Sequence, residues 1–179
     1  GLSVYSDAYE YYAPEKGSER HHHMLLDTLE KIVAQPPSAK KTKTFTYLHQ
    51  IAQKIKRRSL IFLFTDMFQD DEEEERLFEA LRHLKYNKHE LTLFHTYDRE
   101  RELNFDFDNA PKRFIDVETG EGVNLYADTV KANYEEAVRA YFERLRIKCM
   151  QYQINYVPVD IQQSFDQVLT TYLVERRKY

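Results

Sequence analysis

Apolar and polar residues follow one another along this chain with two different periods. Apolar residues recur every three to four positions in five segments, which predicts helices. The predicted helices open at residues 17–18, follow a basic loop at 38–42, start in the acidic run 70–75, span 129–153 and begin after Ser164. Prolines at 36–37 stop the first, and Asp128 is expected to cap the fourth.

The helical period also predicts which side chains face the core. In the first helix they are Leu25, Leu26, Leu29, Ile32 and Val33, and in the second Phe45, Leu48, Ile51, Ala52 and Ile55. In the third they are Leu77, Ala80, Leu81 and Leu84, and in the long fourth helix Val130, Tyr134, Ala137, Tyr141, Leu145 and Cys149. In the last helix they are Phe165, Val168, Leu169, Tyr172 and Leu173.

Strands are predicted between these helices. Residues 2–6 and 9–13 indicate an edge hairpin, and the clearest strand is 59–66, where the run LIFLF is apolar on both faces. Such a run is typical of a central parallel strand covered by helices on both sides. Further strands are predicted at 90–97 and 154–159, a second hairpin at 114–125, and an irregular segment at 99–112. The alternation predicts an α/β fold with a mainly parallel sheet.

Aspartates stand where four of the predicted strands end, namely Asp7, Asp66, Asp98 and Asp160. Chains leave a parallel sheet at the carboxyl ends of its strands, and open α/β sheets bind ligands at that edge. The four aspartates therefore predict an acidic rim that binds a metal or repels anions. The alternative interpretation is that each one caps the helix that follows, because Asp is a preferred N-cap residue.

Composition narrows the choice of function. A length of 179 residues fits one domain spanning 1–179, and the net charge of −4 argues against broad nucleic-acid binding. No apolar run is long enough to cross a membrane. The single cysteine, Cys149, lies in a helical pattern and is expected to be buried, in keeping with a cytoplasmic protein. Because the chain opens at Gly1 directly before a strand, we expect it to be truncated at its N-terminus.

Motifs for catalysis are scarce. There is no G-x-G-x-x-G and no P-loop among only 4 glycines, and no G-x-S-x-G elbow. The histidines at 21–23 diverge around a helix, so they are expected to form an exposed helix start and not a metal cluster. His95 lies within a strand, where a hydrogen-bonded structural histidine is expected. The run 70–75 is interpreted as a solvated helix start.

Several segments together resemble a known family. KRRSLIFLFTDMF with the acidic helix after it, LTLFHTYDRERELNFDF, RFIDVETGEGVNLYAD and INYVPVDIQQSFDQVLTTYL are similar to segments of the bacterial von Willebrand factor A-like proteins catalogued as domain of unknown function 58. These segments cover most of residues 55–173. The N-terminal LSVYSDAYEYYAPEKGSE resembles the second strand and edge hairpin of the same family. Members are often encoded beside MoxR-type AAA+ ATPases.

The resemblance implies a Rossmann-like, doubly wound von Willebrand A sheet with a hairpin insertion near 114–125. It also implies a metal ion-dependent adhesion site built from three loops. Asp66 matches the aspartate of the third loop, and Thr42 matches the threonine of the second, with Thr44 as the competitor. The D-x-S-x-S of the first loop is missing, so magnesium is expected in a full-length protein and not in this chain.

The first, central strand of the family is missing as well, which would leave an open edge in the sheet. A bare edge with unpaired backbone groups is costly and adhesive. Three outcomes are open: the strand belongs to a longer native chain, residues 2–6 pair directly with 59–66, or a second copy fills the gap as a homodimer.

The resemblance implies a non-catalytic protein-interaction domain that works with a MoxR-type AAA+ ATPase in assembly or maturation of a partner. The alternative is a metal-dependent phosphoester hydrolase or nuclease that uses Asp7, Asp66, Asp98 and Asp160. A nuclease would need a basic track for phosphates, whereas this rim is acidic. A third interpretation is a structural domain in which the aspartates only cap helices.

Overall fold

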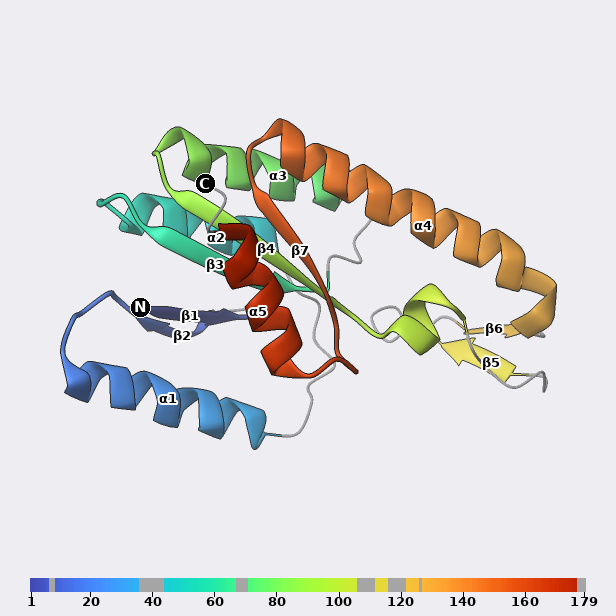
Figure 1. Cartoon of the computed structure of the whole chain (residues 1–179), viewed down its shortest axis with the longest axis horizontal. Coiled ribbons are helices and arrows are strands. Elements are labelled where there is room, and N and C mark those ends of the chain that lie inside the picture. Colours follow the sequence, from blue (N-terminus) through green and yellow to red (C-terminus); the bar gives the residue numbers. More distant parts are fainter. Residues whose placement is uncertain are drawn as a thin grey trace.

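The structure is a computed structural model that describes residues 1–6, 9–35, 44–66, 71–105, 112–115, 122–125 and 127–176. Strands and helices alternate along most of the chain (Figure 1). The strands are β1 Leu2–Tyr5, β2 Tyr9–Ala13, β3 Leu60–Thr65, β4 Glu90–Tyr97, β5 Lys112–Ile115, β6 Gly122–Leu125 and β7 Asn155–Asp160. The helices are α1 Glu19–Val33, α2 Thr44–Lys54, α3 Asp71–Tyr86, the short η1 Arg99–Leu103, α4 Ala127–Gln151 and α5 Phe165–Arg176.

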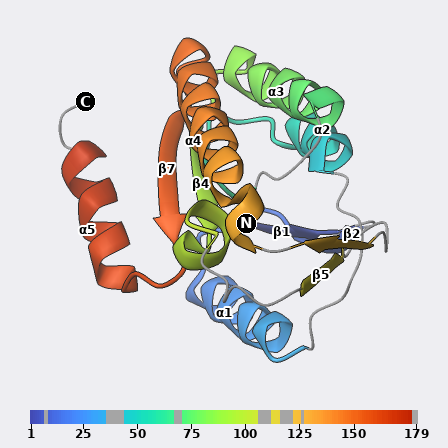
Figure 2. The same cartoon turned by 90° about the vertical axis from the view of Figure 1, so that its right-hand side faces the viewer.

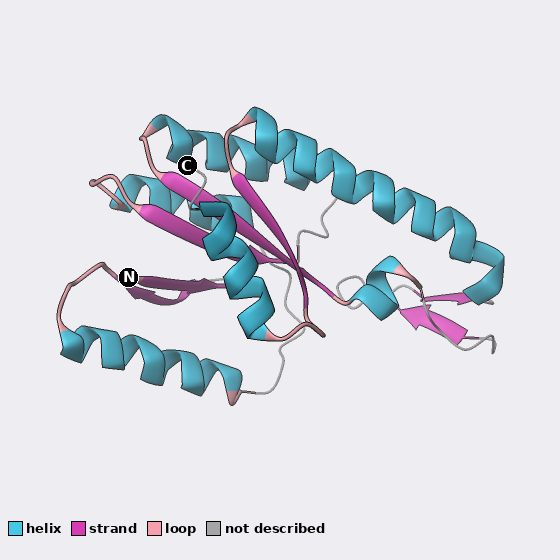
Figure 3. Ribbon diagram, in the orientation of Figure 1, coloured by secondary structure: helices cyan, strands magenta, loops and turns pink. Residues whose placement is uncertain are grey.

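Three parallel strands form the central sheet, in the order β3-β4-β7 (Figure 3). The register pairs Leu60 with Glu90 across β3 and β4, and Tyr97 with Asp160 across β4 and β7. Both predicted hairpins are confirmed as separate antiparallel pairs, β1 with β2 and β5 with β6. The mixed α/β fold with a parallel sheet flanked by helices is therefore confirmed.

Helices cover the two faces of this sheet unequally (Figures 1 and 2). Helices α2, α3 and α4 pack on one face around the main core, which includes Leu48, Leu63, Leu81, Leu93 and Leu145. On the opposite face α5 packs, through a small cluster of Phe94, Val157 and Tyr172. Alternate residues of β4 enter different clusters because side chains along a strand point to opposite faces.

The strand β3 departs from its prediction. The run LIFLF was expected in the middle of the sheet with both faces covered, whereas β3 lies at the edge of the three-stranded sheet. Its side chains on the α5 side are exposed, with fractions of 40% for Leu60, 45% for Phe62 and 64% for Phe64. Helix α5 packs mainly against β4 and β7 through Tyr172 and Val168 and reaches β3 at Phe62, whose ring meets that of Tyr172 edge-on at 5.7 Å.

The possibility that residues 2–6 pair directly with residues 59–66 is also wrong for the described residues. Strand β1 pairs with β2 and forms no ladder with β3. The hairpin is nevertheless attached to the main core. Tyr5 packs against the core cluster and stacks on Tyr47 of α2 with ring centroids 5.7 Å apart. The Lys54 ammonium lies 4.5 Å from the centre of the Tyr12 ring.

Several predicted core faces are exposed. Leu26, Leu29 and Val33 of α1 are exposed, as are Phe165, Leu169 and Leu173 of α5, and Ala137 of α4. In α4 the buried position is the neighbouring Val138, so the prediction for Ala137 is wrong. The predicted faces of α1 and α5 are confirmed only in part, at the half-buried Leu25, Ile32 and Val168 and the buried Tyr172. Val130 lies in α4, but its side chain is outside what the structure describes.

The start of α4 and the segment after β4 differ from their predictions. Helix α4 begins at Ala127, so Asp128 lies within its first turn and is not its cap. The segment expected to be irregular contains η1, a single π-helical turn closed by the bond from Asn104 N to Arg99 O at 2.9 Å. By contrast, Ser18 caps α1 as its position suggested, and it accepts a hydrogen bond from the His21 amide at 3.3 Å.

The acidic start of α3 is only partly solvated. Glu74 is 2% exposed, and the Lys148 ammonium of α4 donates to it at 2.6 Å, with Arg144 at 3.7 Å. This buried ion pair joins α3 to α4, which corrects the expectation of a purely solvent-facing acidic run. Among the described helices, none combines the length and the apolarity that a membrane crossing requires.

Candidate functional site

Three of the four strand-end aspartates lie at one edge of the sheet, the carboxyl edge of the parallel strands. Asp66 follows β3, Asp98 follows β4 and Asp160 ends β7, and parallel register brings these strand ends together. We call Asp66, Asp98, Arg99, Glu102 and Asp160 the rim. The prediction that these aspartates share an edge is confirmed for the three described ones, while Asp7 lies outside the described residues.

Asp98 caps the turn that follows it. Its carboxylate accepts hydrogen bonds from the amides of Glu100 at 3.0 Å and Arg101 at 3.2 Å. In return, the Glu102 carboxylate accepts from the Asp98 amide at 3.0 Å. These reciprocal bonds satisfy amide groups that the first turn of a helix leaves without partners. The capping interpretation is therefore correct for Asp98.

Asp160 is held by an arginine and by the backbone. The Arg99 Nε donates to its carboxylate at 3.0 Å, and the Gln162 amide donates at 3.1 Å. Asp160 is 5% exposed, so this ion pair compensates a charge that burial would otherwise disfavour. Arg99 also donates to the Tyr97 hydroxyl at 3.4 Å, which fixes the guanidinium between β4 and β7.

The remaining rim carboxylates influence one another electrostatically. Partial burial raises the pKa of Glu102, and the nearby charges of Asp66 and Asp98 raise it further, while the hydrogen bond from the Asp98 backbone opposes the shift. Asp66 itself is exposed. The rim therefore has one solvent-facing aspartate, Asp66, beside three carboxylates that already accept hydrogen bonds, those of Asp98, Glu102 and Asp160.

His95 lies directly beneath the rim and is fully buried. Its Nδ1 is 2.7 Å from the Tyr156 hydroxyl, and its ring packs 4.6 Å from that of Phe142. Burial lowers the pKa of His95 to about 4, although a hydrogen bond with the backbone of Asp66 opposes the change. This arrangement confirms the prediction of a hydrogen-bonded structural histidine.

The described part of the rim offers few free ligands for a metal ion. Asp98 and Asp160 direct their oxygens to amides and to Arg99, and no group of three or more His, Cys, Asp or Glu among the described residues could hold a metal ion. Thr42 lies outside the described residues, and Thr44 is the first residue of α2. Magnesium prefers octahedral oxygen ligation, which Asp66 alone does not provide.

Arg99 and Glu102 were not predicted from the sequence. The signal that could have found them is the order Asp98-Arg99-Glu100-Arg101-Glu102, which resembles a capping box lengthened by one residue. Tyr156 was also missed, and no local pattern could have identified it, because it reaches His95 across the β4–β7 pairing.

The exposed fractions of Cys149 and of the histidines at 21–23 test two further predictions. Cys149 is buried as expected, and burial raises the pKa of its thiol to about 12, so the reactive thiolate is suppressed at neutral pH. The histidines at 21–23 do not form an exposed group as predicted, because His21 is 8% exposed and only His22 and His23 face solvent.

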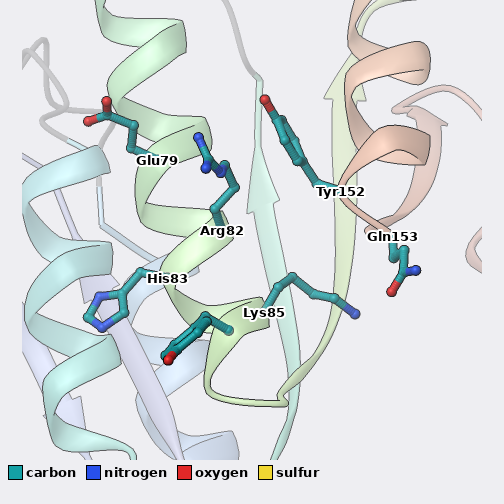
Figure 4. A pocket seen from close by; sticks show the side chains of 7 residues that line it. Glu79, Arg82, His83, Lys85, Tyr152 and Gln153 are labelled. Carbon is teal, nitrogen blue, oxygen red and sulfur yellow. The ribbon is translucent and has the colours of Figure 1, made fainter.

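A groove of about 630 Å³ lies where α3 and α4 end, near the starts of β4 and β7 and away from the rim (Figure 4). Its lining includes Arg82, His83, Lys85, Tyr152 and Gln153. The Arg82 guanidinium lies 5.4 Å from the centre of the Tyr152 ring, so these two side chains form a cation–π contact with each other. The groove contains none of the predicted site residues.

Comparison of the chain with curated proteins and with solved structures found no match. A family model does match, and it covers residues 1–144, from β1 into α4. That range contains the rim residues of β3 and β4 and excludes Asp160. By this match, the chain belongs to the family described as Protein of unknown function DUF58.

Proposed function

We propose that this chain is a non-catalytic protein-interaction domain of the von Willebrand A type. In this proposal it works in the cytoplasm with a MoxR-type AAA+ ATPase in assembly or maturation of a partner protein. The observation that carries the proposal is the apolar face of β3, formed by Leu60, Phe62 and Phe64, which ends beside the exposed Asp66 of the rim.

Exposed apolar groups support protein binding because the free energy of the complex falls when a partner removes these groups from water. Contacts with the buried Phe94 of the neighbouring strand β4 hold the side chains of Phe62 and Phe64 in place. Phe64 stacks on the buried Phe94 at 4.7 Å, and Phe62 meets the same ring edge-on at 5.7 Å. Aromatic side chains, phenylalanine among them, are enriched in protein–protein interfaces.

The described rim supports binding over hydrolysis. A metal-dependent phosphoesterase needs carboxylate oxygens that converge on an ion. Here Asp98 accepts from two backbone amides, and Asp160 accepts from Arg99 and a further amide. Because these bonds already occupy two of the three strand-end carboxylates, we propose that the rim orients Asp66 for contact with a partner and does not perform chemistry.

The proposal is tested by measuring binding of the whole chain to a purified MoxR-type ATPase by biolayer interferometry. We expect Phe64→Ser to weaken binding by about tenfold or more, as loss of an interface anchor does. The matched control is Phe165→Ser, which changes a phenylalanine of α5 that is 73% exposed, compared with 64% for Phe64. Equal affinities for the two variants would contradict the proposed surface.

Hydrolysis is the competing outcome of the same study. The chain is incubated with a chromogenic phosphoester and magnesium or manganese. Turnover that disappears in Asp66→Ala would replace the binding proposal with the metal-dependent hydrolase. Absence of turnover together with ATPase binding would support the interaction domain.

A further inference from the structure

The groove at the ends of α3 and α4 lies apart from the rim and from the open side of β3. Its lining comes from α3 and from the two residues that follow α4, Tyr152 and Gln153. In the sheet order β3-β4-β7 the family's first strand would lie beside β3, whereas these two helices lead into β4 and β7. Described segments alone therefore form the groove.

Both helix ends at the groove are fixed by backbone hydrogen bonds. After α3 the His89 amide donates to Leu84 O at 3.3 Å, and after α4 the Ile154 amide donates to Cys149 O at 2.8 Å. Between the helices, the buried ring of Phe78 lies 5.8 Å from that of Tyr152. A ligand would thus meet a preformed surface, which lowers the entropic cost of binding.

The groove contains positive charge that no carboxylate of the described chain neutralises. The other four arginines of α3 and α4 all form ion pairs, namely Arg76 with Glu72, Arg139 with Glu135, Arg144 with Glu74 and Arg146 with Glu143. Within the part of the chain that the structure describes, neither Arg82 nor Lys85 has such a partner. Glu79, the acidic residue of the lining, extends to the opposite side of α3 (Figure 4).

The helix dipole explains only part of this charge. Cations are favoured at the C-terminal end of a helix, and His83 and Lys85 belong to the last turn of α3. The amides of Asn87 and Lys88 already bond to the carbonyls of those two residues, and Arg82 is directed across to the Tyr152 ring of α4. A guanidinium that stacks on a ring keeps its in-plane N–H donors available for an anion.

We propose that this groove binds an acidic segment of a partner protein, at a site separate from the β3 face. Arg82 binds one carboxylate with two of its N–H donors, and Lys85 provides positive charge for a second carboxylate. Tyr86 also lines the groove and is 86% exposed, so its ring can cover an apolar side chain beside the acidic residues.

Charge favours this partner over the alternatives. Nucleic acid needs a track of cations along its phosphates, whereas the groove offers Arg82 and Lys85 on a chain with a net charge of −4. A second copy of the chain would offer its own acidic run in α3, but Glu72, Glu74 and Glu75 of that run already form ion pairs.

The probe is a short fluorescein-labelled peptide in which two adjacent glutamates and a leucine lie between neutral residues. Its binding to the whole chain is followed by fluorescence anisotropy. We expect saturable binding that weakens as the salt concentration rises, because salt screens the attraction between opposite charges. The same peptide with glutamines in place of the glutamates is expected to bind at least about tenfold more weakly.

Variants of the chain assign the binding to the groove. Arg82→Glu is expected to weaken peptide binding by about tenfold or more. Arg20→Glu makes the same change of net charge at an exposed position of α1 and is expected to leave binding unchanged. Arg82→Lys keeps the charge but loses the planar fork, so it is expected to retain only part of the affinity. Circular dichroism checks that each variant is folded before affinities are compared.

Several results would overturn the proposal. Equal binding of the glutamate and glutamine peptides is one, and absence of saturable binding is another. Equal losses in Arg20→Glu and Arg82→Glu would reduce the effect to net charge. An oligonucleotide that binds more tightly than the peptide, and more weakly to Arg82→Glu, would assign the groove to nucleic acid. Binding of the ATPase that depends on Phe64 and not on Arg82 would leave the proposed function standing even if the peptide fails to bind.

Discussion

At the scale of residues, the rim shows that one residue type in equivalent positions adopts three roles. Asp98 caps η1, Asp160 accepts from Arg99 and a backbone amide, and Asp66 faces solvent. The difference comes from what lies next to each carboxylate, because an aspartate accepts whichever donors its turn presents. A shared position at strand ends therefore does not imply a shared function.

These roles predict different effects on stability. Asp98→Ala removes an acceptor from two backbone amides and is expected to lower the free energy of unfolding by about 1 kcal/mol. Asp66→Ala alters an exposed side chain and is expected to change it by less than about 0.5 kcal/mol. Urea denaturation of the two variants and the parent measures both. A loss for Asp66→Ala as large as that for Asp98→Ala would show that Asp66 also has a capping role.

His95 predicts how stability depends on pH. Burial lowers its pKa from the usual 6.5 to about 4, so the unfolded chain takes up a proton at a higher pH than the folded one does. The contribution of His95 to stability is therefore complete above pH 6.5 and is lost as the pH falls toward 4. The slope due to one such group approaches about 1.4 kcal/mol per pH unit.

The measurement is the free energy of unfolding of the parent and of His95→Gln from pH 4.5 to 7.5. We expect the difference between the two curves to shrink as the pH falls. Tyr156→Phe is the control, because it removes the hydroxyl bonded to His95 and keeps the imidazole, so the pH slope is retained. Parallel curves for the parent and His95→Gln would mean that His95 does not titrate as described.

At the scale of elements, β3 separates what local sequence can predict from what it cannot. The run LIFLF correctly predicted a strand, because β-branched and aromatic residues favour extended backbone. It also predicted cover on both faces, and there the described chain differs. Whether a strand is central depends on which other segments pair with it, and that information lies elsewhere in sequence or on a partner.

The ends of α3 and α4 were hard to predict for a different reason. Each is followed by a residue with positive φ, Lys88 at 64° and Gln153 at 56°, a conformation usually signalled by glycine. The amides of His89 and Ile154 then close these ends by bonding to Leu84 O and Cys149 O. The ends lead directly into β4 and β7, so the geometry is set by where the strands must begin.

The candidate site was predictable only where its order is local. The positions of Asp66, Asp98 and Asp160 at strand ends could be read from the chain, since strand boundaries and parallel order fix them. The bonds of Arg99 to Asp160 and of His95 to Tyr156 each join residues 61 positions apart. Such pairs depend on the register between β4 and β7, which no single segment specifies.

At the scale of the whole molecule, apolar surface is exposed on three elements at once. Leu26, Leu29 and Val33 of α1, the β3 face, and Phe165, Leu169 and Leu173 of α5 are all exposed. Scattered apolar residues are ordinary on protein surfaces, whereas a contiguous apolar patch marks a site of association. The partner site that we propose is the β3 face, because Leu60, Phe62 and Phe64 lie on one side of a single strand.

Magnesium decides whether that association uses a metal. A site with a Kd of ~0.1 mM would raise the free energy of unfolding by about 2 kcal/mol at roughly 5 mM magnesium, or the melting temperature by roughly 4–8 °C. Asp98 and Asp160 already accept hydrogen bonds from amides and from Arg99, which leaves Asp66 as the one exposed rim aspartate, and a single carboxylate is too few ligands to hold magnesium. We therefore expect magnesium to change the melting temperature by less than about 1 °C in differential scanning fluorimetry. Asp66→Asn should behave as the parent does. A magnesium-dependent rise that disappears in both Asp66→Asn and Thr42→Ala would instead establish a metal site completed by residues outside the described part of the chain, and would make metal bridging the mode of partner contact.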